Sequence, residues 1–377
     1  FPYKKSALHP YPHPHSHNQF HFSQLHMDPS LKLIFTIGLL LFVSGSLLTV
    51  HASTSYKPTY KPSKLFVFGD SYVDAGNSPK STSDSWKPPY GETFPGEAAG
   101  RWSNGRVWSD FVAKFLGLKS PVAYELRSTA GENSVTYGMN FAYGGTGVFD
   151  TLSPLPNVTV QIDHLEQLIN DKLYNSSDLE SSVALLAISG NDYFAFLSTH
   201  GFNETQAWLE FIAKVVNQMV VDAERIRGLG VKKIAINSIA PLGCVPYISS
   251  FNSSGGCYDT ANTLAVYHNL LLQQAIAKLN NQTTDNSYIY VDFYTTFLTI
   301  LENHGKHPGS SEFVNPLKAC CAGTNTTYNC GSVDANGVKQ YTVCADPNSS
   351  FFWDKFHPTQ YGWRDVYLSL RKILTQL

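Results

Sequence analysis

The stretch KLFVFGDSYVDAGN, residues 64–77, decides how the rest of the chain is interpreted. Leu65–Phe68 form a short apolar run rich in strand-forming residues, and Gly69-Asp70-Ser71 follow at once. Asp and Ser side chains readily hydrogen-bond nearby backbone, so this pattern predicts a strand that ends in a turn. The alternative is that Ser71 is a nucleophile held at the edge of a sheet. Taken alone, the segment favours the turn.

Short apolar runs alternate with helical patterns along the remaining chain. Strands are predicted at Leu65–Phe68, Gly138–Ala142, Val183–Ile188, Ile234–Ile236 and Tyr288–Asp292, and helices at Val107–Leu116, Val160–Leu173, Thr205–Arg227, Thr260–Asn280 and Gln360–Leu377. This alternation predicts βαβ units and a mainly parallel sheet, hence an α/β fold. Val183–Ile188 is apolar throughout and is therefore expected near the centre of the sheet. Residues 78–105 and 305–350 are expected to be long loops.

The N-terminal region contains a pattern typical of a signal peptide. After Met27 comes the weakly basic Lys32, then the apolar run Leu33–Val50, and the small residue Ala52 ends it. We expect residues 27–52 to be a signal peptide cleaved after Ala52. A membrane anchor is the alternative, because the apolar run is long enough to consider one. The His- and Pro-rich residues 1–26 are expected to be leader sequence outside the native protein, residues 53–63 a linker, and residues 64–377 one domain.

All six cysteines of the 377-residue chain lie after the expected cleavage point. An even number of cysteines in a secreted chain favours disulfides, and free thiols in the core are the alternative. Cys320 and Cys321 are adjacent, so each is expected to have a distant partner. We expect one bridge between Cys244 and Cys257, with Cys320 and Cys321 sharing Cys330 and Cys344 in either pairing.

Seven Asn-x-Ser/Thr sequons also fit a secretory route, and they mark surface positions. They lie at Asn157, Asn175, Asn203, Asn252, Asn281, Asn325 and Asn348. The expected location is the extracellular space or cell wall, with the vacuole or the ER lumen as alternatives. The formal net charge is −2 and no basic patch stands out, which argues against nucleic acid as a partner. No stable membrane span is expected once the signal peptide is removed.

Candidate chemistry lies at the expected ends of strands and near the C-terminus. Nucleophilic serine needs a base, which is commonly a histidine oriented by a carboxylate. The segment DKFH places Asp354 three residues before His357, a spacing that lets the carboxylate reach the ring. Acyl transfer also needs donors for a developing oxyanion. The Asn191 side chain in SGNDYF and the glycines of YGGTG could supply them. Each motif taken singly also fits a cap, a turn or a surface histidine.

Taken together in this order, FGDSYVDAGN, NFAYGGTG, SGNDYF and DKFHPT resemble the plant GDSL-type esterase/lipases of the SGNH hydrolase superfamily. The resemblance covers essentially residues 64–377, including PLGCVP and the cysteine-rich region. It implies a three-layer α/β/α sandwich around a mainly parallel sheet. The first motif has Tyr72 where the family name has leucine, a position that is not catalytic. The G-x-S-x-G motif of the common α/β-hydrolases is absent from the sequence.

By position, the resemblance implies that Ser71 is the nucleophile, His357 the base and Asp354 the residue that orients it. The implied oxyanion hole consists of the Ser71 N–H, the Asn191 side chain and a glycine, Gly145 with Gly147 as the alternative. The expected activity is hydrolysis of a small-molecule or lipid ester, with no cofactor and no metal. Two alternatives are an acyltransferase that uses the same residues and a wall glycan- or lipid-binding protein with an idle site. The acyl group, the alcohol group and the oligomeric state are left open.

Overall fold

The computed structural model describes residues 56–58, 61–283, 285–305 and 312–377. The expected leader and signal peptide therefore lie outside the described residues, as does part of the expected linker. Within the described part of the chain, no helix combines the length and apolar character needed to cross a membrane.

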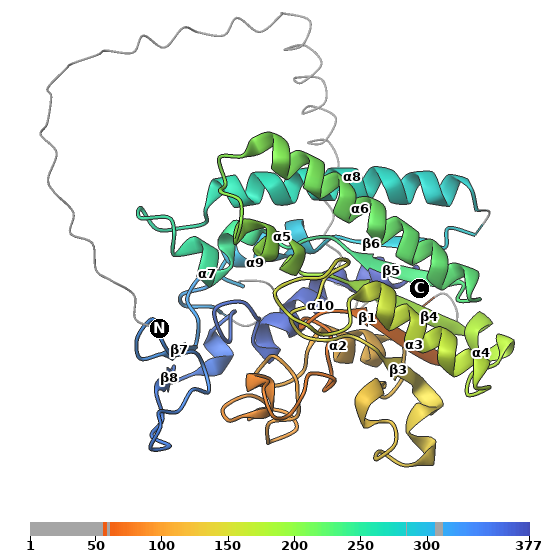
Figure 1. Ribbon diagram of the computed structural model, residues 1–377, viewed down its shortest axis with the longest axis horizontal. Coiled ribbons are helices and arrows are strands. Elements are labelled where there is room, and N and C mark those ends of the chain that lie inside the picture. Colours follow the sequence, from red (N-terminus) through yellow and green to blue (C-terminus); the bar gives the residue numbers. More distant parts are fainter. Residues whose placement is uncertain (1–55, 59–60, 284, 306–311) are drawn as a thin grey trace, which may run out of the picture. The chain divides into compact units, whose positions relative to one another are not determined.

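A parallel six-stranded sheet forms the centre of the fold (Figure 1), in the order β2-β3-β1-β4-β5-β6. Its strands are β1 (Lys64–Gly69), β2 (Val122–Ala123), β3 (Gly138–Asn140), β4 (Ser182–Ala187), β5 (Lys233–Asn237) and β6 (Tyr288–Val291). The expected strand around Val183–Ile188 is confirmed as β4, which pairs with β1 and β5 in the middle of the sheet. The two-residue strand β2 was not predicted.

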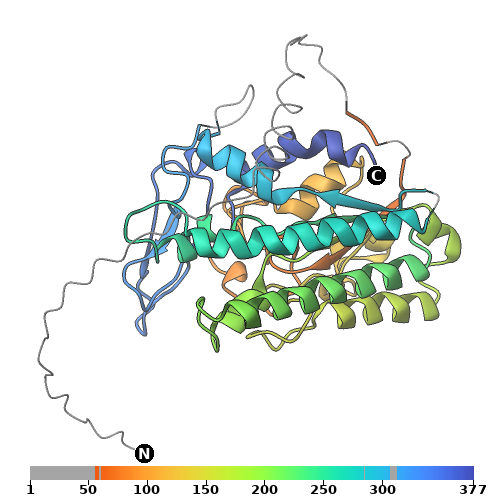
Figure 2. The same ribbon diagram turned by 90° about the horizontal axis from the view of Figure 1, so that it is seen from above.

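Helices cover both faces of the sheet, which gives the three-layer α/β/α arrangement (Figure 2). The longer helices are α2 (Trp108–Phe115), α3 (Val158–Asn170), α6 (Thr205–Gly228), α8 (Asp259–Asn281), α9 (Phe293–Glu302) and α10 (Gln360–Leu374). Shorter helices are α4 (Ser176–Glu180), α5 (Asn191–Leu197) and α7 (Pro246–Ser249). Helices α4, α5, α7 and α9 were not predicted.

Alternating side chains of the strands divide the core into two layers. Phe66 and Phe68 of β1 pack with α3, α6 and α8 on one face. Leu65 and Val67 pack with α2, α9 and α10 on the other face. Because successive side chains of a strand point to opposite faces, an apolar run without interruption is buried between two helical layers.

Polar caps fix where several helices begin. Asn157 accepts a hydrogen bond from the N–H of Val160 at 3.1 Å at the start of α3, and Thr359 accepts one from Gly362 at 2.9 Å at the start of α10. Such caps satisfy donors that have no partner within the helix. The start of α10 lies close to a candidate site residue, because only Pro358 and the cap Thr359 separate it from His357.

The cysteine-rich region carries two short antiparallel strands, β7 (Cys321–Gly323) and β8 (Tyr341–Val343). The three expected disulfides are present: Cys244–Cys257, Cys320–Cys344 and Cys321–Cys330. The pairing that the sequence left open is therefore settled, and no cysteine is free.

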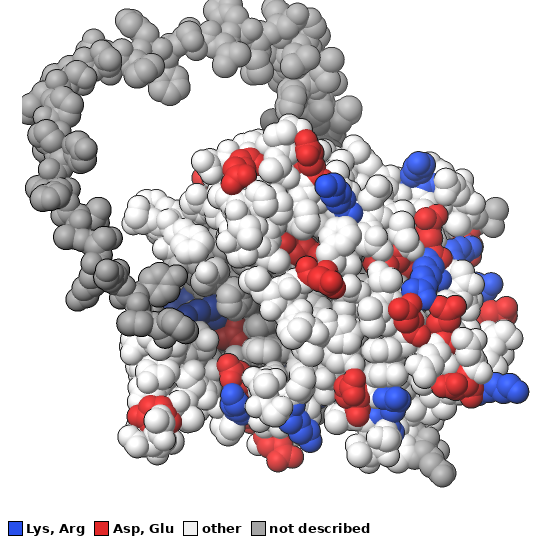
Figure 3. Space-filling view, viewed as in Figure 1, with Lys and Arg blue, Asp and Glu red and all other residues white. Residues whose placement is uncertain are grey.

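Charged side chains are dispersed over the face shown in Figure 3, with Lys and Arg interspersed among Asp and Glu. The sequons were expected to lie at the surface, and most of their asparagines are exposed. Five of the seven are exposed, namely Asn175, Asn203, Asn281, Asn325 and Asn348, whereas Asn157 and Asn252 are half-buried. The surface therefore shows no single-sign patch on this face, in keeping with the small net charge of −2.

Candidate active site

Ser71 lies directly beyond β1, in a turn that a close backbone contact holds against β4. A side chain at Gly69 would place its Cβ 1.8 Å from the carbonyl oxygen of Ala187, so only glycine fits there. The buried Gln161 of α3 accepts from the Gly69 N–H at 2.8 Å and donates to the Gly69 carbonyl at 2.9 Å. These contacts fix the backbone just before Ser71.

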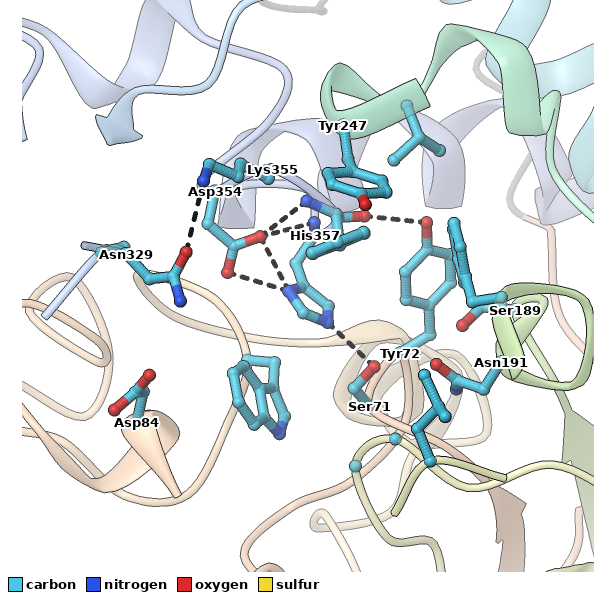
Figure 4. A pocket seen from close by; sticks show the side chains of 18 of the residues that line it. Ser71, Tyr72, Asp84, Ser189, Asn191, Tyr247, Asn329, Asp354, Lys355 and His357 are labelled. Carbon is cyan, nitrogen blue, oxygen red and sulfur yellow. Dashed lines mark hydrogen bonds and ion pairs between the residues drawn. The ribbon is translucent and has the colours of Figure 1, made fainter. Parts of the chain in front are cut away.

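The three residues expected to form a triad meet in one place (Figure 4). Nε2 of His357 lies 2.9 Å from Oγ of Ser71, and Nδ1 lies 2.8 Å from each carboxylate oxygen of Asp354. Ser71, Asp354 and His357 are 5%, 5% and 7% exposed. A neutral imidazole held by a carboxylate on one nitrogen can accept the serine proton on the other.

Asp354 is ionised in a buried position because several donors converge on it. Burial alone would raise the pKa of Asp354, but the charge and hydrogen bond of His357, the hydroxyl of Tyr90 and the N–H of Phe356 lower it below its usual value. The backbone N–H of His357 adds another bond to Oδ1 at 2.9 Å. The carboxylate is therefore available to orient and stabilise the imidazolium.

Among the candidate oxyanion donors, the backbone N–H groups of Ser71, Gly145 and Gly147 have no acceptor among the described residues. Ser71 and Gly145 also line the cleft. The neighbouring Gly144 N–H is already bonded to Asp74 at 3.0 Å. Gly147 does not line the cleft, and a Cβ there would lie 2.3 Å from the carboxylate of Asp192. The geometry therefore favours Gly145 over Gly147 as an oxyanion donor.

Asn191 opens α5 beside Ser71, but its amide already has acceptors. Nδ2 donates to Asp70 Oδ2 at 3.0 Å and to the carbonyl of Thr146 at 2.9 Å. An oxyanion at this amide would share one of these hydrogens in a three-centre bond or displace the Thr146 carbonyl. Asp70 also sets the orientation of the Asn191 amide, because a flipped amide would turn its oxygen toward the Asp70 carboxylate and be repelled by it.

Asp70, which precedes the candidate nucleophile, is a buried acid that anchors the Asn191 loop. Its Oδ2 accepts from the N–H and Oγ of Ser189 at 2.5 and 2.7 Å, as well as from Asn191. Its Oδ1 accepts from the N–H of Tyr72 at 3.1 Å. Burial raises the pKa of Asp70 to about 6, although the bonds from Ser189 and Tyr72 act in the opposite direction.

A cleft of about 890 Å³ opens in front of these residues. On one side it is lined by rings that contact one another, from Phe194 of α5, Tyr247 of α7 and Phe356. On the other side lie polar groups, including Asp84 and Lys355, whose Nζ donates to Asn329 at 3.3 Å (Figure 4). The cleft therefore offers an aromatic arm and a polar arm.

Several residues that shape the site were not predicted from the sequence. Tyr90 donates to Asp354 at 2.7 Å, Trp102 stacks on the ring of His357 with centroids 5.1 Å apart, and Gln161 holds the turn before Ser71. Tyr90 and Trp102 come from the loop expected at residues 78–105, whose Pro, Gly and Trp content was the only signal. Their roles depend on contacts between distant parts of the chain.

Comparison with known proteins agrees with these observations. The pattern of the family described as GDSL-like Lipase/Acylhydrolase matches residues 65–367. One GDSL esterase/lipase of Arabidopsis thaliana is 49% identical over 93% of this chain and 98% of its own length. Another is 51% identical over 83% of this chain and 89% of its own length.

Among solved structures, phospholipase A1 from Streptomyces albidoflavus NA297 aligns with 82% of this chain and 98% of its own, at 14% identity and a TM-score of 0.37. The family assignment comes from the sequence matches, which extend over nearly the whole described chain. The chain therefore belongs to the GDSL-like lipase/acylhydrolase family.

Proposed function

We propose that the protein is a secreted serine esterase/lipase that hydrolyses carboxylic esters through an acyl-enzyme on Ser71. The observation that carries this proposal is the continuous chain of contacts from Ser71 through His357 to Asp354. The named activity of the Arabidopsis relatives supports an ester as the substrate class. The open cleft supports a small-molecule or lipid ester that approaches Ser71 from solvent.

The reaction begins when Oγ of Ser71 attacks the ester carbonyl and His357 accepts its proton. The developing oxyanion lies against the N–H groups of Ser71 and Gly145, with the Asn191 amide as a third donor. His357 then protonates the departing alcohol, and Asp354 stabilises the imidazolium meanwhile. Water, deprotonated by His357, attacks the acyl-enzyme; the bond between the acyl carbon and Oγ of Ser71 then breaks, His357 returns the proton to Oγ, and the acid is released. Groups that stabilise charge only in the transition state raise turnover rather than binding.

An acyltransferase is the second candidate, and the aromatic arm of the cleft favours it. Phe194, Tyr247 and Phe356 form an apolar wall that could hold an alcohol in place of water. The two functions share every step up to the acyl-enzyme and differ only in the acceptor. A catalytically idle binding protein fits less well, because such a protein has no need of a buried, ionised Asp354 directed at His357.

Turnover of aryl and long-chain esters tests the proposal, with and without added alcohols. Hydrolysis is supported if the free acid is the main product, and acyl transfer if a new ester dominates at low alcohol concentration. Ser71→Ala and His357→Ala should abolish either reaction, since members of a triad act as a unit. Asn191→Ala should reduce turnover about 100–1,000-fold, the usual effect of losing one oxyanion donor. Wild-type turnover in Ser71→Ala would contradict the mechanism.

Secretion is supported by the three disulfides and by the exposure of most sequons. Disulfides persist mainly in oxidising compartments. If residues 27–52 are removed as proposed, N-terminal sequencing of the purified native protein should find a start at or within a few residues of Ser53. A native protein that still contains Lys32 would contradict cleavage and favour the anchor.

A further inference from the structure

We propose that two buried tyrosines, Tyr72 and Tyr90, are positioning residues that hold the Asp354–His357 turn from two sides. This inference rests on the proposed function, because it takes His357 as the base. One hydroxyl binds the backbone of the turn and the other binds the carboxylate that orients the histidine. Together they determine where the imidazole lies relative to Ser71.

Tyr72 ties the nucleophile turn directly to the turn that carries the base. Its hydroxyl donates to the carbonyl of Phe356 at 3.1 Å, across 284 residues of sequence (Figure 4). That carbonyl has no other partner among the described residues. The Tyr72 ring is 5% exposed and packs edge-on against Trp363 with centroids 4.9 Å apart. The contact therefore joins the residue after Ser71 to the residue before His357.

The identity of residue 72 matters for this contact. The motif for which the family is named has leucine at this position, and leucine could fill the same apolar space. Leucine cannot donate a hydrogen bond, however, so it would leave the half-buried carbonyl of Phe356 without this donor. In this chain the tyrosine adds a link that the leucine motif lacks.

Tyr90 acts on the other side of the same turn. Its hydroxyl donates to Oδ2 of Asp354 at 2.7 Å, whereas Oδ1 accepts the N–H groups of Phe356 and His357. The ring is 3% exposed and lies between Trp102 and Trp353. With both oxygens bonded, the carboxylate cannot rotate away from Nδ1 of His357 without breaking a charge-assisted bond.

The hydroxyl of Tyr90 remains a donor at working pH. Burial and the nearby Asp354 carboxylate raise the pKa of Tyr90 well above its usual value. The loop that carries it is also anchored, because the Tyr341 hydroxyl of β8 donates to the carbonyl of Pro88 at 3.2 Å. The N–H of Cys321 donates to the carbonyl of Trp353 at 2.6 Å, next to Asp354. The disulfide-bonded region thus supports both partners of this bond.

The alternative is that the two tyrosines contact substrate, since both line the cleft. A substrate contact used equally in the ground and transition states would change KM and leave kcat unchanged. A positioning role predicts the reverse, because substrate binding is untouched while the base is misplaced. The split between kcat and KM therefore separates the two.

The test compares Tyr72→Phe and Tyr90→Phe with the control Tyr174→Phe. Tyr174 is 2% exposed and its hydroxyl donates to the carbonyl of Val135 at 3.3 Å, but it does not line the cleft. Each site variant should lose ~10-fold in kcat on an aryl ester with little change in KM, the effect of one lost hydrogen bond of about 1.4 kcal/mol. The control should keep wild-type kcat. Titration of reactive sites with a serine-directed phosphonate corrects every kcat for folded protein.

Unchanged kcat in both site variants would overturn the proposal, and so would a rise in KM alone. The double variant adds a further check, because two contacts that hold one turn should not act independently. Its loss in kcat should be smaller than the product of the two single losses. Wild type and Ser71→Ala are measured beside them. If wild type lacks turnover, the proposed function fails. If wild type is active and both tyrosine variants keep the kcat of the control, only this inference fails.

Discussion

Replacing Asp70 and Asp222 by asparagine tests whether the acid beside Ser71 serves catalysis rather than stability. Burial raises the pKa of each carboxyl from 3.8 to about 6. A carboxyl with a raised pKa stabilises the fold at pH values below 3.8 and loses that stability as the pH rises to about 6. At 1.36 kcal/mol per unit, a neutral isostere avoids a penalty of about 3 kcal/mol at pH 7.

Asp222 is the matched control because it lies away from the cleft, on α6 facing α3. Its Oδ1 accepts from Thr159 and Gln218 at 3.1 and 3.0 Å, whereas its Oδ2 is buried and has no partner in the described part of the chain. Asparagine can keep the first two bonds with its own oxygen, but its amide nitrogen then takes the place of Oδ2 and has no acceptor there, which costs about 1–3 kcal/mol. The difference in the free energy of unfolding between Asp222→Asn and wild type should therefore rise by up to ~3 kcal/mol from pH 3.5 to pH 7, because only the wild-type carboxyl ionises over that range.

Asp70→Asn should behave differently, because its carboxylate accepts four hydrogen bonds. Asparagine has one oxygen, so its amide nitrogen would face the N–H of Tyr72 if the bonds of Ser189 and Asn191 are kept. One unsatisfied buried donor costs about 1–3 kcal/mol, which offsets most of the gain. Because a neutral amide oxygen binds the Asn191 side chain less strongly than a carboxylate does, turnover should fall ~10- to 100-fold, below the full loss of an oxyanion donor.

Urea unfolding at the two pH values gives the stabilities, and turnover of an aryl ester gives the activities. Relative to wild type, Asp222→Asn should gain stability from pH 3.5 to pH 7 and be fully active, and Asp70→Asn should have near-wild-type stability at pH 7 and reduced turnover. Wild-type turnover in Asp70→Asn would refute the role assigned to this acid. An Asp222→Asn variant that gains no stability relative to wild type between the two pH values would refute the assignment of the raised pKa.

Two further predictions concern the covalent state of the protein. Thiol labelling of the denatured, non-reduced protein should modify no cysteine, and two or more labelled cysteines would contradict three bridges. Removing the Cys321–Cys330 bridge by paired serine substitution should cost about 2–5 kcal/mol of stability. Glycopeptide mass spectrometry should find Asn252 unoccupied while exposed sequons such as Asn175 carry glycan, because Nδ2 of Asn252 donates to Gly255 and Cys257 at 2.7 and 3.0 Å. Full occupancy at Asn252 would contradict this.

Much of the fold was predictable because it depends on local patterns. Apolar runs such as residues 65–68 and 183–188 became the two central strands, and the helical spacings around 160–173 and 205–227 became α3 and α6. Elements with weak local signals were missed. β2 has only two residues, and α9, with the sequence FYTTFLTILE, is rich in aromatic and β-branched residues that do not favour helices.

The same limit applies to the site. The D-x-x-H spacing predicts a local contact, and Asp354 and His357 do meet. The segment SGNDYF was expected to supply an oxyanion donor, and taken singly it also fits a turn; in the structure Asn191 begins a helix. The bonds of Tyr72 to Phe356 and of Tyr90 to Asp354 join residues 284 and 264 positions apart. No local periodicity encodes such contacts, since they arise only when the C-terminal turn packs against the turn after β1 and the loop at residues 78–105.

The central claim is that Ser71 is the nucleophile, and covalent trapping tests it most directly. The purified protein is treated with a serine-directed phosphonate, digested and analysed by mass spectrometry for the modified residue. The account predicts one adduct on Ser71 in the wild type, none in Ser71→Ala, and slow labelling in His357→Ala because the base that activates the hydroxyl is gone. If Ser71 merely ended a strand, Ser71→Ala would lose about 1 kcal/mol of stability and keep its turnover. An adduct on another residue, or an unmodified Ser71 in an active enzyme, would contradict the account.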